Sequence, residues 1–223
     1  MSTIESIKQV NNVAASMLAQ GEIIGGGRLC QQGLAILKTY FEDSISKEGV
    51  SPNTMSPLSK VEYVGIKFED STPLSRQLAY SPNNAFELYK CAFSIEGNEC
   101  NVDTMAAVLL YNFALALHYR GIFEAKETFL QKALRLYQAS AEILSAEVMH
   151  GRGSNRSVSS LYLANISNQT HLFSHWMDHE SVQICLNVIF RLYDVVDPPD
   201  SLIFYHMISK ANGRVFMRNA PSA

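Results

Sequence analysis

Three histidines, His171, His175 and His179, recur at four-residue spacing in one stretch of the chain. On a continuous helix this spacing places the three imidazoles on one face, where two of them can bind zinc once a third ligand joins them. The HExxH motif of zinc peptidases is missing from the stretch. The favoured interpretation is therefore structural, with the histidines at the end of a helical hairpin near Trp176, and a metal-dependent enzyme on this face is the less favoured alternative.

Other patterns typical of catalytic sites are incomplete. The glycines at 25–27 follow no predicted strand and precede no GK[ST] sequence, so neither usual phosphate-binding loop is present. The chain has no G-x-S-x-G motif, and its four cysteines (Cys30, Cys91, Cys100 and Cys185) form no CxxC pair. We therefore expect no enzyme activity, no metal and no cofactor.

The charge pattern argues against two classes of partner. Lysine and arginine number 18 against 21 aspartates and glutamates, and they are scattered, so no basic stripe for nucleic acid or an anionic membrane is visible. Residues 1–20 interrupt every apolar run with polar side chains, unlike a signal peptide or a membrane helix. We expect a protein of the cytosol or nucleus without membrane insertion. Its charged content of 17% is low, as at a contact surface.

The elements that must position the histidines are helices, because the hydrophobic period over most of the chain is helical. Residues 11–41 contain two apolar stripes separated by Gly21, and residues 110–138 contain two stripes separated by Gly121. A glycine between two such stripes is typical of the turn between antiparallel helices. The pattern predicts two helical hairpins, each turning at its glycine.

The two hairpins share their internal spacing, which indicates a repeat. Asn12 and Asn112 both lie nine residues before the predicted turn glycine. Gly33 and Ala133 both lie twelve residues after it. Residues 164–193 carry a similar pattern with a polar corner near Asp178 in place of the glycine, and they predict a third hairpin.

These positions resemble the tetratricopeptide repeat, a family in which small residues and a turn glycine hold two antiparallel helices together. The matching residues are Ala14, Gly21 and Gly33 in the first unit and Ala114, Gly121 and Ala133 in the second. Longer strings such as FELYKCAFSI and VLLYNFALALHYRG are similar to a group of helical-repeat proteins abundant in diatoms. The resemblance implies a superhelix of helical hairpins and no particular chemistry.

A different period appears between the first two hairpins. In VEYVGIKF and AFELYKCAFSI, apolar side chains alternate along the chain, which predicts strands at 61–68 and 85–95, paired antiparallel. Residues 202–208 and 214–218 are candidates for further short strands. Because an isolated hairpin is only marginally stable, we expect a small sheet packed on the helices.

The predicted fold is mainly α: one domain over residues 1–223, made of antiparallel helical hairpins with a small inserted antiparallel β-hairpin or sheet. Its parts are hairpin 1 at about 4–46, the β insertion at about 58–97, hairpin 2 at about 104–148, hairpin 3 at about 157–195 and a C-terminal cap at 200–223.

The resemblance implies a groove lined by the first helix of each hairpin, and a scaffold or adaptor that binds a partner protein there. Its candidate binding residues are Asn11, Tyr111, Leu115, His118, Tyr119, Asn168 and His171. Tyrosine is common in binding sites because it offers contact area and a hydrogen bond at low entropic cost. Two alternatives stay open: the inserted segment itself fills the groove, or the chain is a structural subunit of a larger complex.

Overall fold

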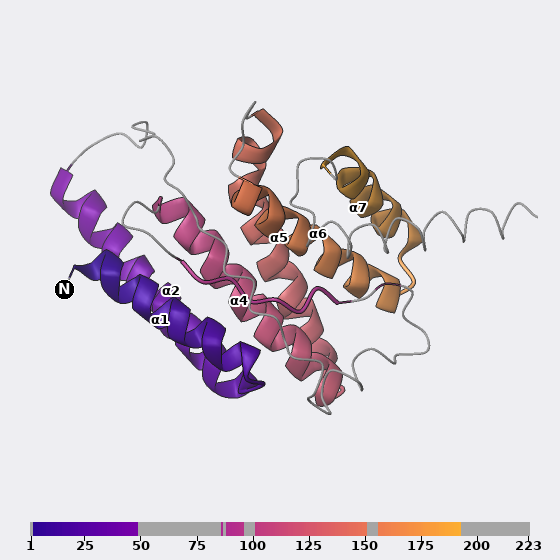
Figure 1. Cartoon of the computed structure of the whole chain (residues 1–223), viewed down its shortest axis with the longest axis horizontal. Coiled ribbons are helices and arrows are strands. Elements are labelled where there is room, and N and C mark those ends of the chain that lie inside the picture. The colour runs from indigo at the N-terminus through magenta and orange to yellow at the C-terminus, as the bar shows by residue number, and fades with distance from the viewer. Residues whose placement is uncertain (1, 49–85, 87, 96–100, 151–155, 193–223) are drawn as a thin grey trace, which may run out of the picture.

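The computed structural model describes residues 2–48, 86, 88–95, 101–150 and 156–192. Six α-helices make up most of these residues (Figure 1). They are α1 (Thr3–Ala19), α2 (Ile23–Glu48), α4 (Val102–Phe123), α5 (Glu127–His150), α6 (Arg156–His175) and α7 (His179–Leu192). The prediction of a mainly α-helical fold is confirmed.

The helices pack as consecutive pairs. Within the described residues, α1 contacts α2, α4 contacts α5 and α6 contacts α7, and the pairs contact one another through α2 with α4 and α5 with α6. Each pair is joined by a short connection, at 20–22, 124–126 and 176–178, which brings the second helix back along the first. Figure 1 shows the resulting row of helices, which runs from α1 and α2 at one end to α7 at the other.

The ends of the helices follow from local chemistry. Ser2 caps α1, because its hydroxyl accepts a hydrogen bond from the amide of Glu5 at 3.2 Å. Gly21 ends the first turn with φ of +83°, a left-handed conformation that glycine adopts without strain. Asp178 lies just before α7, and its carboxylate accepts a hydrogen bond from the amide of Ser181 at 3.1 Å. The turn predicted at Gly21 and the polar corner predicted near Asp178 are both present.

The turn predicted at Gly121 is displaced. The helix α4 continues through this glycine to Phe123, and the connection instead passes through Ala125, whose φ is +49°. Gly121 is buried, and a Cβ atom there would overlap the side chain of Leu130 on α5. This glycine therefore permits close contact between α4 and α5. Sequence spacing alone does not distinguish such a glycine from one in a turn.

The predicted β insertion is not shown. No strand occurs among the described residues, and residues 88–95, within the predicted strand 85–95, have an extended backbone without a paired strand. The strands predicted at 61–68, 202–208 and 214–218 and the C-terminal cap at 200–223 lie outside the described residues. The alternation of period two predicted a strand at 85–95, whereas residues 88–95 are extended but form no strand.

The central helix is α4, which has buried side chains all around its axis. By length and composition it is the one helix in the described part of the chain that could cross a membrane, and most of its apolar stretch is buried inside the protein. The helix α4 has two opposite faces. One carries Tyr111, Asn112, Leu115 and Tyr119, and the other carries Phe113, Leu117 and Arg120. Each face contributes to one of the two candidate functional surfaces.

Candidate functional site

The extended segment 88–95 lies across the first helix of each pair. Figure 1 shows it crossing the row of helices, and its hydrogen bonds reach α1, α4 and α6. Its C-terminal end, Ile95, lies on α1, and Tyr89 lies on α6. The segment therefore fills the groove that the first helices of the three pairs form.

Three asparagines hold the segment by its backbone. The Oδ1 atom of Asn12 accepts a hydrogen bond from the amide of Ile95 at 2.7 Å, and its Nδ2 donates to the carbonyl of the same residue at 2.8 Å. Asn112 makes the same pair with Phe93, at 2.9 and 2.7 Å. The third pair joins Asn168 to Tyr89, at 2.8 and 3.1 Å. On each of three helices, one asparagine carboxamide thus forms hydrogen bonds with both the amide and the carbonyl of one residue of the segment.

The contacts fall on alternate residues of the segment. Between the residues held by asparagines, the carbonyl of Cys91 accepts a hydrogen bond from the hydroxyl of Tyr111 at 3.1 Å. Residues 89, 91, 93 and 95 are therefore all bound by side chains of the first helices. A strand partner normally satisfies the backbone groups on one edge of an extended chain. Here the side chains of the helices take that role, which explains an extended segment without a sheet.

Aromatic side chains fill the space between the segment and the helices. The ring of Phe93 lies edge-on to Tyr111 with centroids 5.0 Å apart, and it stacks along the segment on Tyr89 at 6.2 Å. Tyr111 in turn contacts Tyr137 of α5 at 5.6 Å. Edge-on and offset pairs at these separations are favourable beyond the area that they bury. The segment is therefore part of the hydrophobic core.

Asn11 connects two of the backbone contacts. Its Nδ2 donates to the carbonyl of Phe93 at 3.0 Å, and its Oδ1 accepts from Asn112 at 2.9 Å. Both asparagines are fully buried. Buried carboxamides are costly unless their polar atoms are paired, so this arrangement requires the segment in place or another chain that offers the same groups.

A chain of buried polar groups leads from the groove into α6. Asn168 donates to the hydroxyl of Tyr137 at 3.1 Å, and that hydroxyl lies 3.4 Å from Nδ1 of His118. The Nε2 atom of His118 lies 3.1 Å from Nδ1 of His171. All contacts are satisfied when Tyr137 donates to His118 and His118 donates to His171, with both imidazoles neutral.

The burial of the two histidines favours that neutral state. Burial lowers the pKa of His118 well below its usual 6.5, and the nearby His171 and His175 lower it further. Burial, followed by His175, lowers the pKa of His171 to about 3. Burial likewise raises the pKa of Tyr137. The network is therefore uncharged near neutral pH, and it fixes the side chain of Asn168 that contacts the segment.

The structure places the predicted binding residues beneath the segment or in the network behind it. Asn11, Tyr111 and Asn168 contact the segment directly, and His118 and His171 form the network. Leu115 and Tyr119 are buried on α4. Burial raises the pKa of Tyr119, and the nearby thiol of Cys91 raises it further. The alternative that the chain itself fills the groove is the arrangement observed.

Two of the residues that hold the backbone, Asn12 and Asn112, were not among the predicted binding residues. Their signal was present in the sequence, since both lie nine residues before a predicted turn glycine. Asn168 lies nine residues before Met177, which takes the left-handed conformation with φ of +58°. All three asparagines therefore begin the same nine-residue interval, whereas only two of the three intervals end on a glycine.

The predicted histidine face does not form. The helix α6 ends at His175, and His179 is the first residue of α7, so the three imidazoles do not share one helix. His171 is buried, whereas His175 lies 3.9 Å from Glu127 at the surface. No group of three metal-binding side chains occurs among the described residues. The less favoured interpretation, a metal site on one helix face, required a continuous helix through His179, and the predicted polar corner near Asp178 interrupts it.

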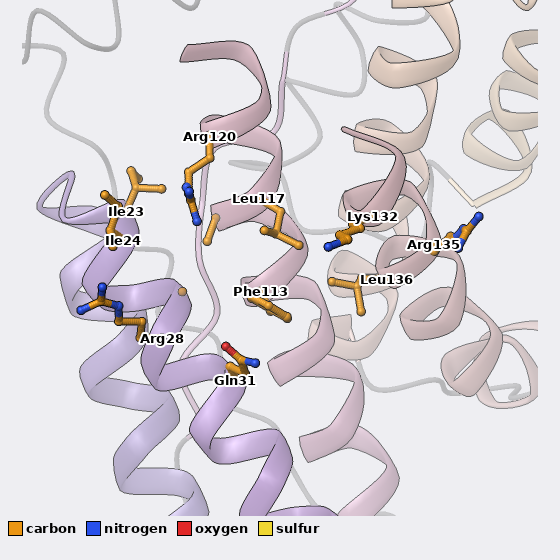
Figure 2. A pocket seen from close by; sticks show the side chains of 12 residues that line it. Ile23, Ile24, Arg28, Gln31, Phe113, Leu117, Arg120, Lys132, Arg135 and Leu136 are labelled. Atoms are coloured by element: carbon orange, nitrogen blue, oxygen red, sulfur yellow. The ribbon is translucent and has the colours of Figure 1, made fainter. Parts of the chain in front are cut away.

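The opposite face of α4 carries an open cavity of about 660 Å³ between α2, α4 and α5. Its floor is apolar and includes Phe113, Leu117 and Leu136. Its other lining residues include four cations, Arg28, Arg120, Lys132 and Arg135, and no acidic side chain. Figure 2 shows Arg120 and Lys132 directed into the space, with Arg28 and Arg135 at its two margins.

Comparisons of the chain find no matching family model, no matching curated protein and no matching solved structure.

Proposed function

We propose that this chain is a protein-interaction module of the tetratricopeptide type that binds an extended segment of a partner protein in the groove now filled by residues 88–95. The observation that carries the proposal is the set of three asparagine pairs on Tyr89, Phe93 and Ile95. Each pair contacts only the backbone amide and carbonyl, which every residue except proline offers. A groove of this kind accepts an extended peptide of another chain by the same six hydrogen bonds.

The selectivity of the groove comes from side chains. Leu88, Tyr89, Ala92, Phe93 and Ile95 are all buried in the bound segment. Backbone hydrogen bonds give affinity for any extended peptide, and pockets for side chains choose among sequences. The preferred partner segment therefore resembles the chain's own, with an aromatic residue at the positions of Tyr89 and Phe93 and a small one at Ala92.

The chain's own segment competes with any partner. Only residues 96–100 separate Ile95 from the cap of α4, whereas residues 49–85 precede the segment on its other side. A short connection keeps a released segment at an effective concentration in the millimolar range. A free peptide of similar sequence therefore binds the full chain weakly, and a partner gains affinity by contacting a second surface as well.

The proposal is tested with a variant in which residues 88–95 are replaced by a Gly/Ser sequence of equal length. We expect this variant to bind a synthetic peptide with the sequence FELYKCAFSI in calorimetry, and the full chain to bind it at least about tenfold more weakly. A folded variant that binds no peptide would contradict the proposal.

Two further variants make the result specific to the asparagines. Replacing Asn12 and Asn112 by leucine in the Gly/Ser variant removes four of the six backbone hydrogen bonds, so peptide binding is expected to fall by at least about tenfold. Asn187 is exposed on α7, and its replacement by leucine serves as the control that leaves binding unchanged. If the Gly/Ser variant does not fold, the displacement of residues 88–95 by the peptide is measured in the full chain through the hydrogen exchange of their amides.

A further inference from the structure

The cavity on the opposite face of α4 is distinct from the groove in both composition and exposure. The groove is filled by residues 88–95, whereas the cavity is open and lined by four cations without an acidic residue. The chain as a whole has more acidic than basic residues, 21 against 18. A basic cavity on such a protein is therefore a local feature of the fold, produced by bringing α2, α4 and α5 together.

Three of the four cations of the cavity have no ion-pair partner in the described part of the chain. Lys8, Lys38 and Lys126 each pair with a glutamate in the described part of the chain. Within the same residues Arg28, Lys132 and Arg135 have no hydrogen bond or ion pair, and all three are exposed. Arg120 is held by Glu124 at 2.7 Å and lies over the ring of Phe129 at 4.3 Å. Three charges on the cavity are thus available to an anionic group.

The cavity continues along the surface. A second hollow of about 370 Å³ shares Ile23, Ile24 and Arg120 with it and extends to Phe123. Ile24 is 54% exposed and Phe123 is 42% exposed, so both side chains add apolar area to this surface. The close approach of α2 to α4 creates the floor, because a Cβ atom at Gly27 would lie only 3.1 Å from the side chain of Ala116. The combined surface is apolar at its base, with the cations Arg28, Lys132 and Arg135 beside the first cavity and the carboxylates of Glu22 and Glu124 beside the second hollow.

We propose that the cavity between α2, α4 and α5, which we call the basic groove, binds an acidic segment of a partner protein that carries at least one large apolar side chain. Carboxylates of the segment would lie beside Arg28, Lys132 and Arg135, where Figure 2 shows cations on both sides of the cavity. Its apolar side chain would enter the floor at Phe113, Leu117 and Leu136. Apolar anchors in a pocket with charged residues around them are the usual anatomy of a protein interface.

The occupant follows from charge and shape together. A nucleic acid would also be attracted by cations, but the apolar floor and the exposed Ile24 and Phe123 match side chains better than a phosphate backbone. A small carboxylate would use the cations and leave the apolar surface uncovered. An acidic peptide with an apolar anchor satisfies both parts of the surface.

The test uses the full chain and a fluorescein-labelled synthetic peptide of glutamates flanking a single phenylalanine, measured by fluorescence anisotropy. We expect binding that weakens as salt is added, because surface charges are screened. Reversing two charges in the variant Arg28→Glu, Lys132→Glu is expected to weaken binding at least about tenfold. The matched control is Lys38→Glu, Arg191→Glu, which makes the same change in net charge at exposed residues outside the basic groove, and it should weaken binding less than about threefold.

Several results would overturn the proposal. They are absence of peptide binding, equal weakening by the two double variants, and equal binding of a peptide with serine in place of the phenylalanine. Competition by free glutamate at the same concentration as the peptide would assign the cavity to a small anion. Concentration-dependent dimers that disappear with Arg28→Glu, Lys132→Glu would assign it to a second copy of the chain. An excess of unlabelled FELYKCAFSI should not displace the labelled peptide, because the two sites lie on opposite faces of α4, and this separates a failure here from a failure of the function proposed above.

Discussion

The carboxamide of Asn112 satisfies both backbone groups of Phe93: its Oδ1 accepts from the amide at 2.9 Å and its Nδ2 donates to the carbonyl at 2.7 Å. The two residues lie on different elements, and both are buried. Each therefore leaves buried polar atoms unpaired if the other is removed. The same relationship at Asn12 and Asn168 makes the groove and its segment mutually dependent.

Replacing Asn112 by leucine is expected to destabilise the full chain by about 2–4 kcal/mol, because the amide of Phe93 and the Oδ1 of Asn11 are then left buried with fewer partners. Urea unfolding followed by circular dichroism measures the change. The control Asn187→Leu, on the exposed side of α7, should change stability by less than about 0.5 kcal/mol. Equal stability of the Asn112 variant and the parent would show that the pair contributes nothing.

Mild acid is expected to destabilise the fold through His118 and His171. Both have a folded-state pKa below the usual 6.5, so the unfolded chain binds their protons first as the pH falls. Stability should be constant above about pH 7 and then decrease, with a slope that approaches about 1.4 kcal/mol per pH unit for each histidine. The decrease should continue toward pH 3, where His171 titrates in the fold.

The histidines are separated from the carboxylates by measuring unfolding between about pH 7 and pH 5, above the range in which most carboxylates titrate. The variant His118→Gln, His171→Gln should show a much flatter curve in this interval. A parent protein whose stability does not change between these two pH values would exclude the buried neutral pair.

Gly121 should not tolerate alanine, although it lies within a helix. Alanine is favoured over glycine in helices by about 1 kcal/mol, but here its Cβ overlaps Leu130. We expect a net loss of about 1–3 kcal/mol in thermal or urea unfolding, as is usual for overpacked cores. The compensating variant Gly121→Ala, Leu130→Ala should show coupling, with a loss smaller than the sum of the two single losses. Strict additivity would mean that the two side chains do not meet.

Thiol reactivity should report on the core and on the segment separately. Burial raises the pKa of Cys30 to about 12 and that of Cys185 to about 11, so both thiols are neutral at pH 8 and should react slowly with an aromatic disulfide reagent. Cys91 lies in the segment, and its labelling, measured in a variant with Cys100 replaced by serine, should accelerate when the segment leaves the groove. Rapid labelling of Cys30 in the native chain would contradict the burial of α2 against α1 and α4.

The helices and their order could be predicted because apolar side chains recur with a helical period on both sides of the turn at Gly21. The polar cap at Asp178 was also visible. The alternation in residues 85–95 predicted a paired strand, and residues 88–95 form none. An alternation of period two indicates that the two sides of a chain face different surroundings. It does not indicate whether a neighbouring strand or asparagine side chains form hydrogen bonds with the backbone.

The errors share one physical cause, since each required knowing which elements meet. Gly121 faces Leu130 across two helices, and nothing local distinguishes that contact from a turn. The histidine spacing gives one face only on a continuous helix, and the polar corner near Asp178 separates His179 from the other two. The basic groove combines cations from three helices, so their scatter along the sequence concealed it.

The central claim is that a partner peptide takes the place of residues 88–95 in the groove. It is tested most directly by the amide hydrogen exchange of Tyr89, Phe93 and Ile95 in isotope-labelled full chain, measured by NMR with and without an excess of unlabelled peptide FELYKCAFSI. Without peptide these amides should exchange slowly, because each donates to an asparagine side chain, of which Asn112 and Asn168 are fully buried and Asn12 is half-buried. With saturating peptide they should exchange at least about tenfold faster, as the segment is displaced. Unchanged protection in the presence of bound peptide would contradict the account.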